Sequence, residues 1–106
     1  MEVLVERFVE FLEKDKQLSL NTLQSYKRDI EQYITYLNEI NLKNISNTNK
    51  TTIIAYLMYL QKKGRATSTI SRNLASLRSF YQDLHKNGVI DSDPTVELES
   101  PKVEKK

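Results

Sequence analysis

The sequence predicts an all-α fold, a compact four-helix bundle followed by a short C-terminal helical turn and a linker. Only two glycines and two prolines occur among the 106 residues, whereas a multi-stranded sheet would need many tight turns. Apolar residues recur at three- and four-residue steps in four separate segments, which is the spacing of amphipathic helices. There are no cysteines, and a chain of this length can bury one hydrophobic core without disulfides.

The first two predicted helices are separated by a short break. The first runs from Glu2 to Lys16 and the second from Leu20 to Asn38, with Ser19 placed to cap the second. The apolar stripe of the first helix consists of Leu4, Val5, Phe8, Phe11 and Leu12, with Asp15 at its edge. The apolar stripe of the second consists of Leu23, Tyr26, Ile30, Tyr33, Ile34 and Leu37. Each set gathers on one helix face, so both faces are expected in the core.

An asparagine-rich loop, residues 39–48, is predicted before the third helix. Its apolar residues are expected to lie against the core, and they are Ile40, Leu42 and Ile45. The third helix is predicted from an Asn49 cap through Lys63, and Gly64 can end it in a left-handed conformation. Its apolar stripe consists of Ile53, Tyr56, Leu57 and Leu60.

The fourth helix is predicted from about Thr67 to Lys86, with Asn87-Gly88 as its stop. Its apolar stripe consists of Ile70, Leu74, Leu77, Phe80, Tyr81 and Leu84. After it, Val89-Ile90 can pack back on the bundle, and Asp93-Pro94 fits a cap that starts one short turn through Leu98.

Two units are therefore expected. Residues 1–99 form one domain, and residues 100–106, with a proline and four charged side chains, form the start of a linker.

Charge is distributed unevenly along the chain. The net charge is only +2, but no acidic residue occurs between Ile40 and Gln82, and that segment carries seven basic residues. The segments before and after it are net negative. A concentrated basic segment is typical of a surface that binds a polyanion. The alternative interpretation is a basic surface that is merely solvated.

Two helices have an unusual face opposite their apolar stripe. On the fourth helix this face consists of Ser68, Ser71, Arg72, Ala75, Arg78, Ser79 and Gln82. Small residues let a helix approach a partner closely, and arginine can bind phosphate or guanine bidentately, so this face favours the DNA major groove. On the second helix the face consists of Asn21, Gln24, Ser25, Arg28, Gln32 and Thr35. Solvated surface and nucleic-acid surface both remain open for that helix, because Glu31 at its edge would weaken phosphate binding.

No pattern in the sequence indicates catalysis, a metal or a cofactor. Phosphate-binding loops, dinucleotide fingerprints, zinc spacings and serine elbows are all missing from the sequence. The tyrosines on the apolar stripes are expected to be core residues with hydrated hydroxyls. His85, the single histidine, is expected to have a structural or surface role. The N-terminus does not resemble a signal peptide and no apolar run could span a bilayer, so a soluble cytoplasmic protein is expected.

Three blocks follow one another along the chain: residues 18–30 (LSLNTLQSYKRDI), residues 70–81 (ISRNLASLRSFY), and residues 88–94 (GVIDSDP), the last followed by Ser100-Pro101-Lys102. Together they resemble the N-terminal core-binding domain of Xer-type tyrosine recombinases and phage integrases.

Two positions depart from the pattern of that family. Leu20 stands where proline is usual, which removes a preorganised helix start but leaves the cap. Ala66 stands where a capping serine is common, so Thr67 is expected to cap the fourth helix and shift its start by one residue.

The resemblance implies a SAM-like helical domain that forms one jaw of a clamp around a recombination site, with the second and fourth helices facing DNA. On the second helix the implied DNA-binding residues are Asn21, Thr22, Ser25 and Arg28. On the fourth helix they are Thr67, Ser68, Ser71, Arg72 and Arg78. Around the preceding turn Lys62, Lys63 and Arg65 would contact phosphates and set the register on DNA.

The same resemblance places catalysis in a second, C-terminal domain, which would hold an arginine, a lysine, a histidine-x-x-arginine element and a tyrosine nucleophile. This chain is therefore expected to be non-catalytic. Its expected partners are duplex DNA, the catalytic domain of the same parent chain and other recombinase protomers, without a membrane, and the isolated chain is expected to be a monomer. The alternatives are a helical protein–protein interaction module for recombinase assembly and a free-standing helix-turn-helix regulator, which the long second and fourth helices fit poorly.

Overall fold

The computed structural model describes residues 2–16, 18–96 and 98, and within that part every regular element is a helix. The elements are α1 (Glu2–Phe11), a π-helical turn (Leu12–Lys16), α2 (Leu20–Glu39), a short 3₁₀ helix (Ile45–Asn47), α3 (Lys50–Lys62) and α4 (Thr67–Lys86). The predicted all-α bundle of four helices is confirmed. The predicted linker, residues 100–106, lies outside the described residues.

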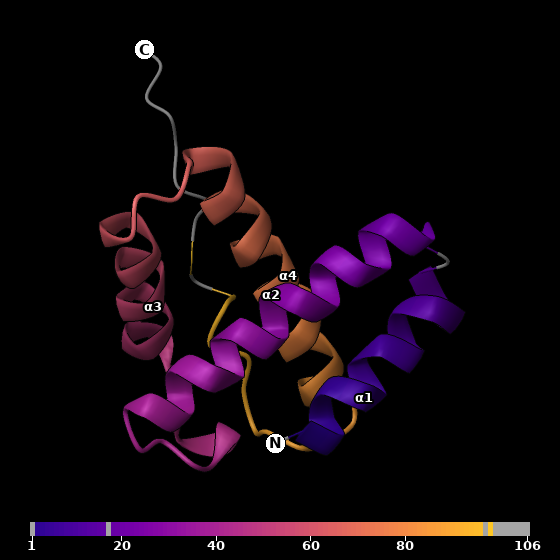
Figure 1. The fold of residues 1–106 in the computed structure, drawn as a ribbon. Coiled ribbons are helices and arrows are strands. Elements are labelled where there is room, and N and C mark those ends of the chain that lie inside the picture. Colours follow the sequence, from indigo (N-terminus) through magenta and orange to yellow (C-terminus); the bar gives the residue numbers. More distant parts are fainter. Residues whose placement is uncertain (1, 17, 97, 99–106) are drawn as a thin grey trace.

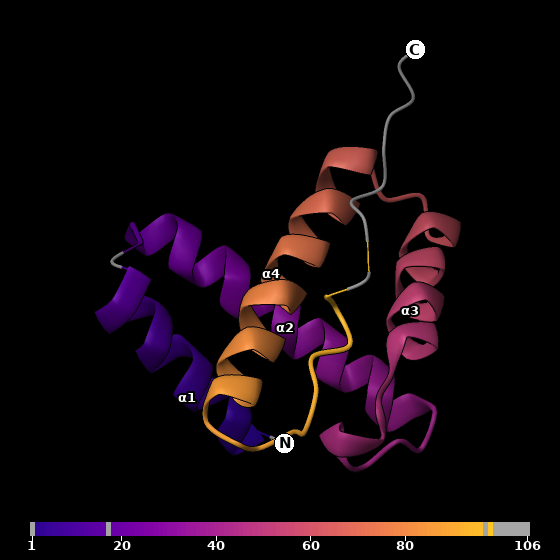
Figure 2. The same cartoon turned by 180° about the vertical axis from the view of Figure 1, so that it is seen from behind.

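Helices α2 and α4 cross at the centre of the bundle, and α1 and α3 flank them on opposite sides (Figures 1 and 2). Helix α1 packs against both α2 and α4. Helix α3 packs against α4 and also meets α2 through aromatic rings, such as Tyr56 on Tyr33 and Tyr59 on Tyr36. The radius of gyration is 13.4 Å, close to the value of about 13 Å expected for a compact domain of 100 residues. The crossing helices are thus held from both sides while each keeps one outer face uncovered.

The predicted helix ends are mostly correct. Ser19 caps α2 by accepting a hydrogen bond from the Thr22 backbone N–H at 3.3 Å. Asn49 caps α3 in a capping box with Thr52, and Gly64 ends that helix region with a φ of +85°. The expected Thr67 cap is wrong: Ala66 is the N-cap residue of α4, and no side chain caps that helix.

The core contains nearly all the residues that the apolar spacing predicts. All six apolar residues predicted on α4 are buried, as are five of the six on α2, with Tyr26 only partly buried. In the loop Ile45 is buried and Leu42 packs at the edge of the core, but the prediction for Ile40 is wrong because 46% of it is exposed. Asp15 belongs to the residues whose side chains are not described.

Three tyrosines from three helices meet in the core. Their hydroxyls were predicted from the sequence to be hydrated, and that prediction is wrong. Tyr33, Tyr56 and Tyr81 are each at most 1% exposed. The Tyr33 and Tyr81 hydroxyl oxygens lie 2.6 Å apart, and Tyr81 donates to the Thr48 hydroxyl at 2.8 Å. Burial raises the pKa of Tyr81 to about 12 and raises the pKa values of Tyr33 and Tyr56 further. The cluster is therefore neutral across the physiological range of pH.

The segment after α4 returns along the bundle, as expected. Ile90 and Leu98 are buried, and Val89 packs against the core. The Asp93 carboxylate accepts hydrogen bonds from the backbone N–H and the hydroxyl of Thr95 at 2.8 and 2.6 Å. The predicted short turn is present as a hydrogen-bonded turn over residues 94–96, and Asp93 has the capping role predicted for it.

Candidate nucleic-acid interface

The outer face of α4 is polar and carries no carboxylate along the whole described helix. Thr67, Ser68, Arg72 and Gln82 are exposed, and Ser71 and Arg78 are partly exposed. The acidic residue of this helix, Asp83, lies on the buried side. The separation of faces that the sequence predicts for α4 is therefore present in the structure.

The outer face of α2 is also polar but more mixed. Asn21, Gln24, Arg28 and Gln32 are exposed, and Thr22 and Ser25 are partly exposed. The Thr22 hydroxyl accepts from Ser19 at 3.0 Å, so it belongs to the helix cap as well as to the surface. Glu31 is exposed on the same helix and adds a negative charge to its edge.

Three exposed cations surround the turn between α3 and α4. They are Lys62, Lys63 and Arg65, and Gly64 between them adopts the left-handed conformation that reverses the chain. The Lys63 ammonium lies 5.1 Å from the centroid of the Tyr59 ring, which is within the range of a cation–π contact. Lys63 and Arg65 also line a hollow of about 250 Å³ between α2 and α3. The turn thus concentrates positive charge beside the start of α4.

The two crossing helices are joined by an ion pair that sequence analysis missed. The Asp29 carboxylate of α2 accepts hydrogen bonds from Nε and Nη2 of Arg72 on α4, at 2.9 and 2.7 Å. The Ser76 hydroxyl donates to the same carboxylate at 2.8 Å. Hydrogen bonding to Asp29 raises the pKa of Arg72, which keeps the guanidinium charged. A signal was available, because a carboxylate beside the apolar stripe of α2 requires a buried partner.

The sequence-predicted residues are not all equally available to a ligand. Arg28, Arg65 and Lys62 have exposed side chains. Arg72 is paired with Asp29 but its side chain remains 44% exposed. Arg78 is partly buried and donates to the Leu98 backbone oxygen, so it also holds the C-terminal segment against α4.

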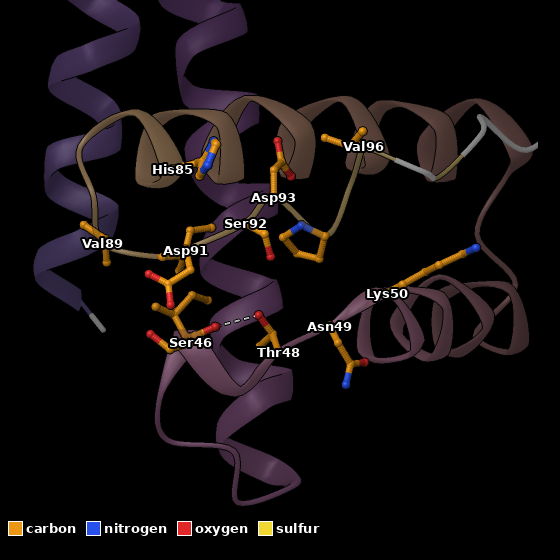
Figure 3. Close-up of a pocket in the computed structure, with 13 residues that line it drawn as sticks. Ser46, Thr48, Asn49, Lys50, His85, Val89, Asp91, Ser92, Asp93 and Val96 are labelled. Atoms are coloured by element: carbon orange, nitrogen blue, oxygen red, sulfur yellow. Dashed lines mark hydrogen bonds between the residues drawn. The ribbon is translucent and has the colours of Figure 1, made fainter.

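A second, larger hollow of about 680 Å³ lies away from these residues (Figure 3). It is formed by the 3₁₀ helix, the start of α3, the last turn of α4 and the segment that follows. His85 and Asp91 are among the side chains around it. Among the described residues there is no group of three or more side chains that could hold a metal ion, and none of the predicted DNA-binding residues lines this hollow.

Within the described part of the chain, no helix has the length and apolar character needed to cross a membrane.

The chain is similar to several named proteins over almost its whole length. It is 41% identical over 103 residues to tyrosine recombinase XerD of Halalkalibacterium halodurans, covering 96% of the chain and 34% of the relative. It is 34% identical over 105 residues to tyrosine recombinase XerC of Herpetosiphon aurantiacus, covering 99% and 34%.

A protein of Caldanaerobacter subterraneus, provisionally named a tyrosine recombinase, is 47% identical over 105 residues, which are 99% of the chain and 36% of that protein. The chain thus spans about a third of the length of these relatives. No solved structure is significantly similar to it. Residues 5–88 match the family described as the phage integrase N-terminal SAM-like domain. The chain therefore belongs to this family, the N-terminal helical part of tyrosine recombinases.

Proposed function

We propose that the chain binds duplex DNA at a recombination site as the N-terminal jaw of a tyrosine recombinase, and does not itself catalyse strand exchange. The observation that carries the proposal is the surface made by α2 and α4. Their outer faces are polar, lie on the two helices that cross at the centre of the bundle, and continue into the cationic turn of Lys62, Lys63 and Arg65.

The chemistry of this surface suits DNA in two ways. Along α4 the small side chains of Ser68, Ser71 and Ala75 would let the helix lie close to the base edges, because the major groove of about 12 Å admits one helix. At the turn before α4, the three cations would bind phosphates, which fixes position but carries little sequence information. On α2 the corresponding contacts would come from Asn21, Thr22, Ser25 and Arg28.

Three further points belong to the proposal. Residues 1–99 form the DNA-binding domain and residues 100–106 begin the link to a catalytic domain of the same parent chain. The partners are that domain, duplex DNA and other recombinase protomers, and the chain by itself is a cytoplasmic monomer. The names of the relatives, tyrosine recombinases, support DNA and recombinase protomers as partners.

A second candidate function is a protein–protein contact within a recombinase assembly. The observation that favours it is the outer face of α3, where Met58 is 58% exposed and Ile54 is 38% exposed. The two side chains are four residues apart and so share one face of the helix. This surface lies apart from the α2 and α4 faces, so both functions can coexist in one chain.

The proposed function is tested by titrating the isotope-labelled chain with a short duplex and following its backbone amide signals. The expected shifts cluster in residues 21–28 and 62–78 and fade as salt rises, because phosphate contacts release counterions. If amide signals shift only in α3, and only when the protein concentration is raised, the protein-contact function is favoured. Unchanged signals in both regions at low salt and millimolar DNA would overturn DNA binding by the isolated chain.

A further inference from the structure

A buried carboxylate, Asp29, lies where α2 and α4 cross, and it is not one of the proposed DNA-binding residues. Asp29 is only 2% exposed and accepts three hydrogen bonds, two from Arg72 and one from Ser76. Its oxygens are therefore well satisfied, and the carboxylate is fixed by groups from both helices. Arg72 in turn is fixed from one side while its side chain stays 44% exposed.

The pairing leaves a particular edge of Arg72 free. A guanidinium has five N–H donors arranged along two forked edges. Asp29 occupies the edge formed by Nε and Nη2, so the other fork, Nη1 and the second hydrogen of Nη2, is not used by Asp29. Two parallel N–H donors of this kind match the O6 and N7 acceptors of guanine, or two oxygens of one phosphate.

We infer that Asp29 is a positioning residue for DNA binding: it holds Arg72 by one edge so that the opposite fork of the guanidinium faces a pair of acceptors on DNA. Ser76 keeps the carboxylate in the orientation that this requires. The inference rests on the proposed function. Fixing the long side chain before the complex forms lowers the entropy that Arg72 loses when it binds.

Charge alone predicts the opposite role for Asp29. A carboxylate beside a DNA-facing arginine lowers the positive potential of the surface, so removing its charge would strengthen attraction to phosphates. Positioning predicts that removing the charge weakens binding, because Arg72 loses its fixed orientation. The sign of one substitution therefore separates the two roles.

The experiment compares Asp29→Asn with Glu31→Gln in the 106-residue chain. Both variants remove one negative charge from α2, but Glu31 is exposed and does not contact Arg72 in the structure. The probe is a fluorescent duplex selected by the wild-type chain from a random pool. We expect roughly tenfold weaker binding for Asp29→Asn, the size of a lost bidentate contact, and unchanged or tighter binding for Glu31→Gln. Equal or tighter binding by both folded variants would overturn the inference.

Two further variants guard against a general loss of structure. Ser76→Ala removes one of the three hydrogen bonds to Asp29 and should weaken binding less than Asp29→Asn. In an Arg72→Ala background, Asp29→Asn should cause no further loss, since the two effects share one path. The same additional loss in that background would show that Asp29 acts through something other than Arg72. The Arg72 Nε–H signal in the free chain provides a readout without DNA, and it should be protected in wild type and exchange rapidly in Asp29→Asn.

Arg72→Lys separates the two sources of the acceptor pair. Lysine keeps the charge but not the fork. A guanine contact predicts that Arg72→Lys loses preference at one base pair of the probe, whereas a phosphate contact predicts a similar loss on every sequence. If the wild-type chain binds no duplex at low salt, the proposed function and the inference both fail. If it binds and Asp29→Asn behaves like Glu31→Gln, the role of Asp29 alone fails.

Discussion

Two polar clusters lie between the helices of this bundle, and they differ in charge and in access to solvent. The ion-pair cluster, Asp29, Arg72 and Ser76, joins α2 to α4 and has one side open, because the Arg72 side chain is 44% exposed. The tyrosine cluster, Tyr33, Tyr56 and Tyr81, joins the same two helices through the hydrogen bond between Tyr33 and Tyr81 but is closed to solvent. The ion-pair cluster is therefore called the open cluster and the tyrosine cluster the closed cluster.

The tyrosine cluster is a directed chain of hydroxyl groups. Thr48 donates to the Ile45 backbone oxygen, and Tyr81 donates to Thr48. Because each hydroxyl has a single proton, Tyr33 must be the donor to Tyr81. The chain ties α2 and α4 to the loop before α3 without any charge. Every donor along this chain, from Tyr33 through Tyr81 to Thr48, has an acceptor. The Tyr56 hydroxyl beside it has no hydrogen-bond partner among the described residues.

The ion-pair cluster joins the same two helices at a higher cost in desolvation free energy, because it contains charged groups. Burying a carboxylate requires compensation, and apolar residues of similar volume often stabilise a fold equally well or better. The open edge of Arg72 adds something that the tyrosine cluster lacks, a fixed cation at the surface. The comparison indicates that the closed cluster only stabilises the fold, whereas the open cluster also holds a positive charge in a fixed position at the surface.

The largest expected effect is on the closed cluster. Tyr33→Ala removes a side chain with 0% exposure that packs on Tyr56 with ring centroids 5.0 Å apart. We expect a loss of about 3–5 kcal/mol in the free energy of unfolding, the usual cost of deleting a buried aromatic ring. Urea denaturation followed by circular dichroism measures it. A loss below that of Arg72→Ala would contradict the ranking of the two clusters.

High pH should weaken the closed cluster and spare the open one. The pKa of Tyr81 is raised to about 12 in the folded chain from about 10 in the unfolded chain. Its contribution to stability is thus present below pH 10 and is lost as pH rises toward 12, which amounts to about 2–3 kcal/mol by linkage. Denaturation at pH 9 through 12 tests this, and Tyr81→Phe should make the decline shallower without abolishing it, because burial also raises the pKa values of Tyr33 and Tyr56. An equally steep decline in that variant would mean that other groups cause it.

The two clusters also differ in how far sequence analysis could anticipate them. Caps such as Ser19 and Asn49 are local, since each bonds a backbone N–H three residues away, so spacing alone predicted them. Asp29 and Arg72 are 43 residues apart in the chain. A carboxylate beside an apolar stripe indicates that a partner exists, but several basic residues could have supplied it until the crossing of α2 and α4 was known.

The errors have similar causes. Ile40 was expected in the core, but the chain reverses at Asn41, where φ is +62°, and Ile40 is left exposed. The tyrosine hydroxyls on the apolar stripes were also expected to be hydrated. That prediction was wrong because the spacing shows which residues face inward but not how deeply they are buried. Helix α4 starts without a side-chain cap at Ala66, since packing of its long buried face stabilises it sufficiently.

The open cluster is expected to matter less for stability than the closed one. Arg72→Ala removes two of the three hydrogen bonds to Asp29 and leaves the carboxylate bound to Ser76. We expect a loss of about 2 kcal/mol, below the cost for a fully buried ion pair because solvent can reach the vacated site. Thermal and urea denaturation measure it, and Arg28→Ala, a change at an exposed arginine of α2, provides the matched control. A cost equal to that of Arg28→Ala would show that the ion pair does not stabilise the bundle.

The smallest effects should have opposite signs within the closed cluster. Tyr33→Phe removes the first donor of the hydroxyl chain, whose remaining bond from Tyr81 to Thr48 is intact, so we expect a loss of about 1 kcal/mol. Tyr56→Phe removes a buried hydroxyl that has no hydrogen-bond partner among the described residues, so we expect a gain of up to about 1 kcal/mol. Both variants keep the aromatic packing, and the difference between their urea midpoints isolates hydrogen bonding from ring burial. A loss in both would mean that the Tyr56 hydroxyl is satisfied in solution, and the closed cluster would then have two polar anchors instead of one.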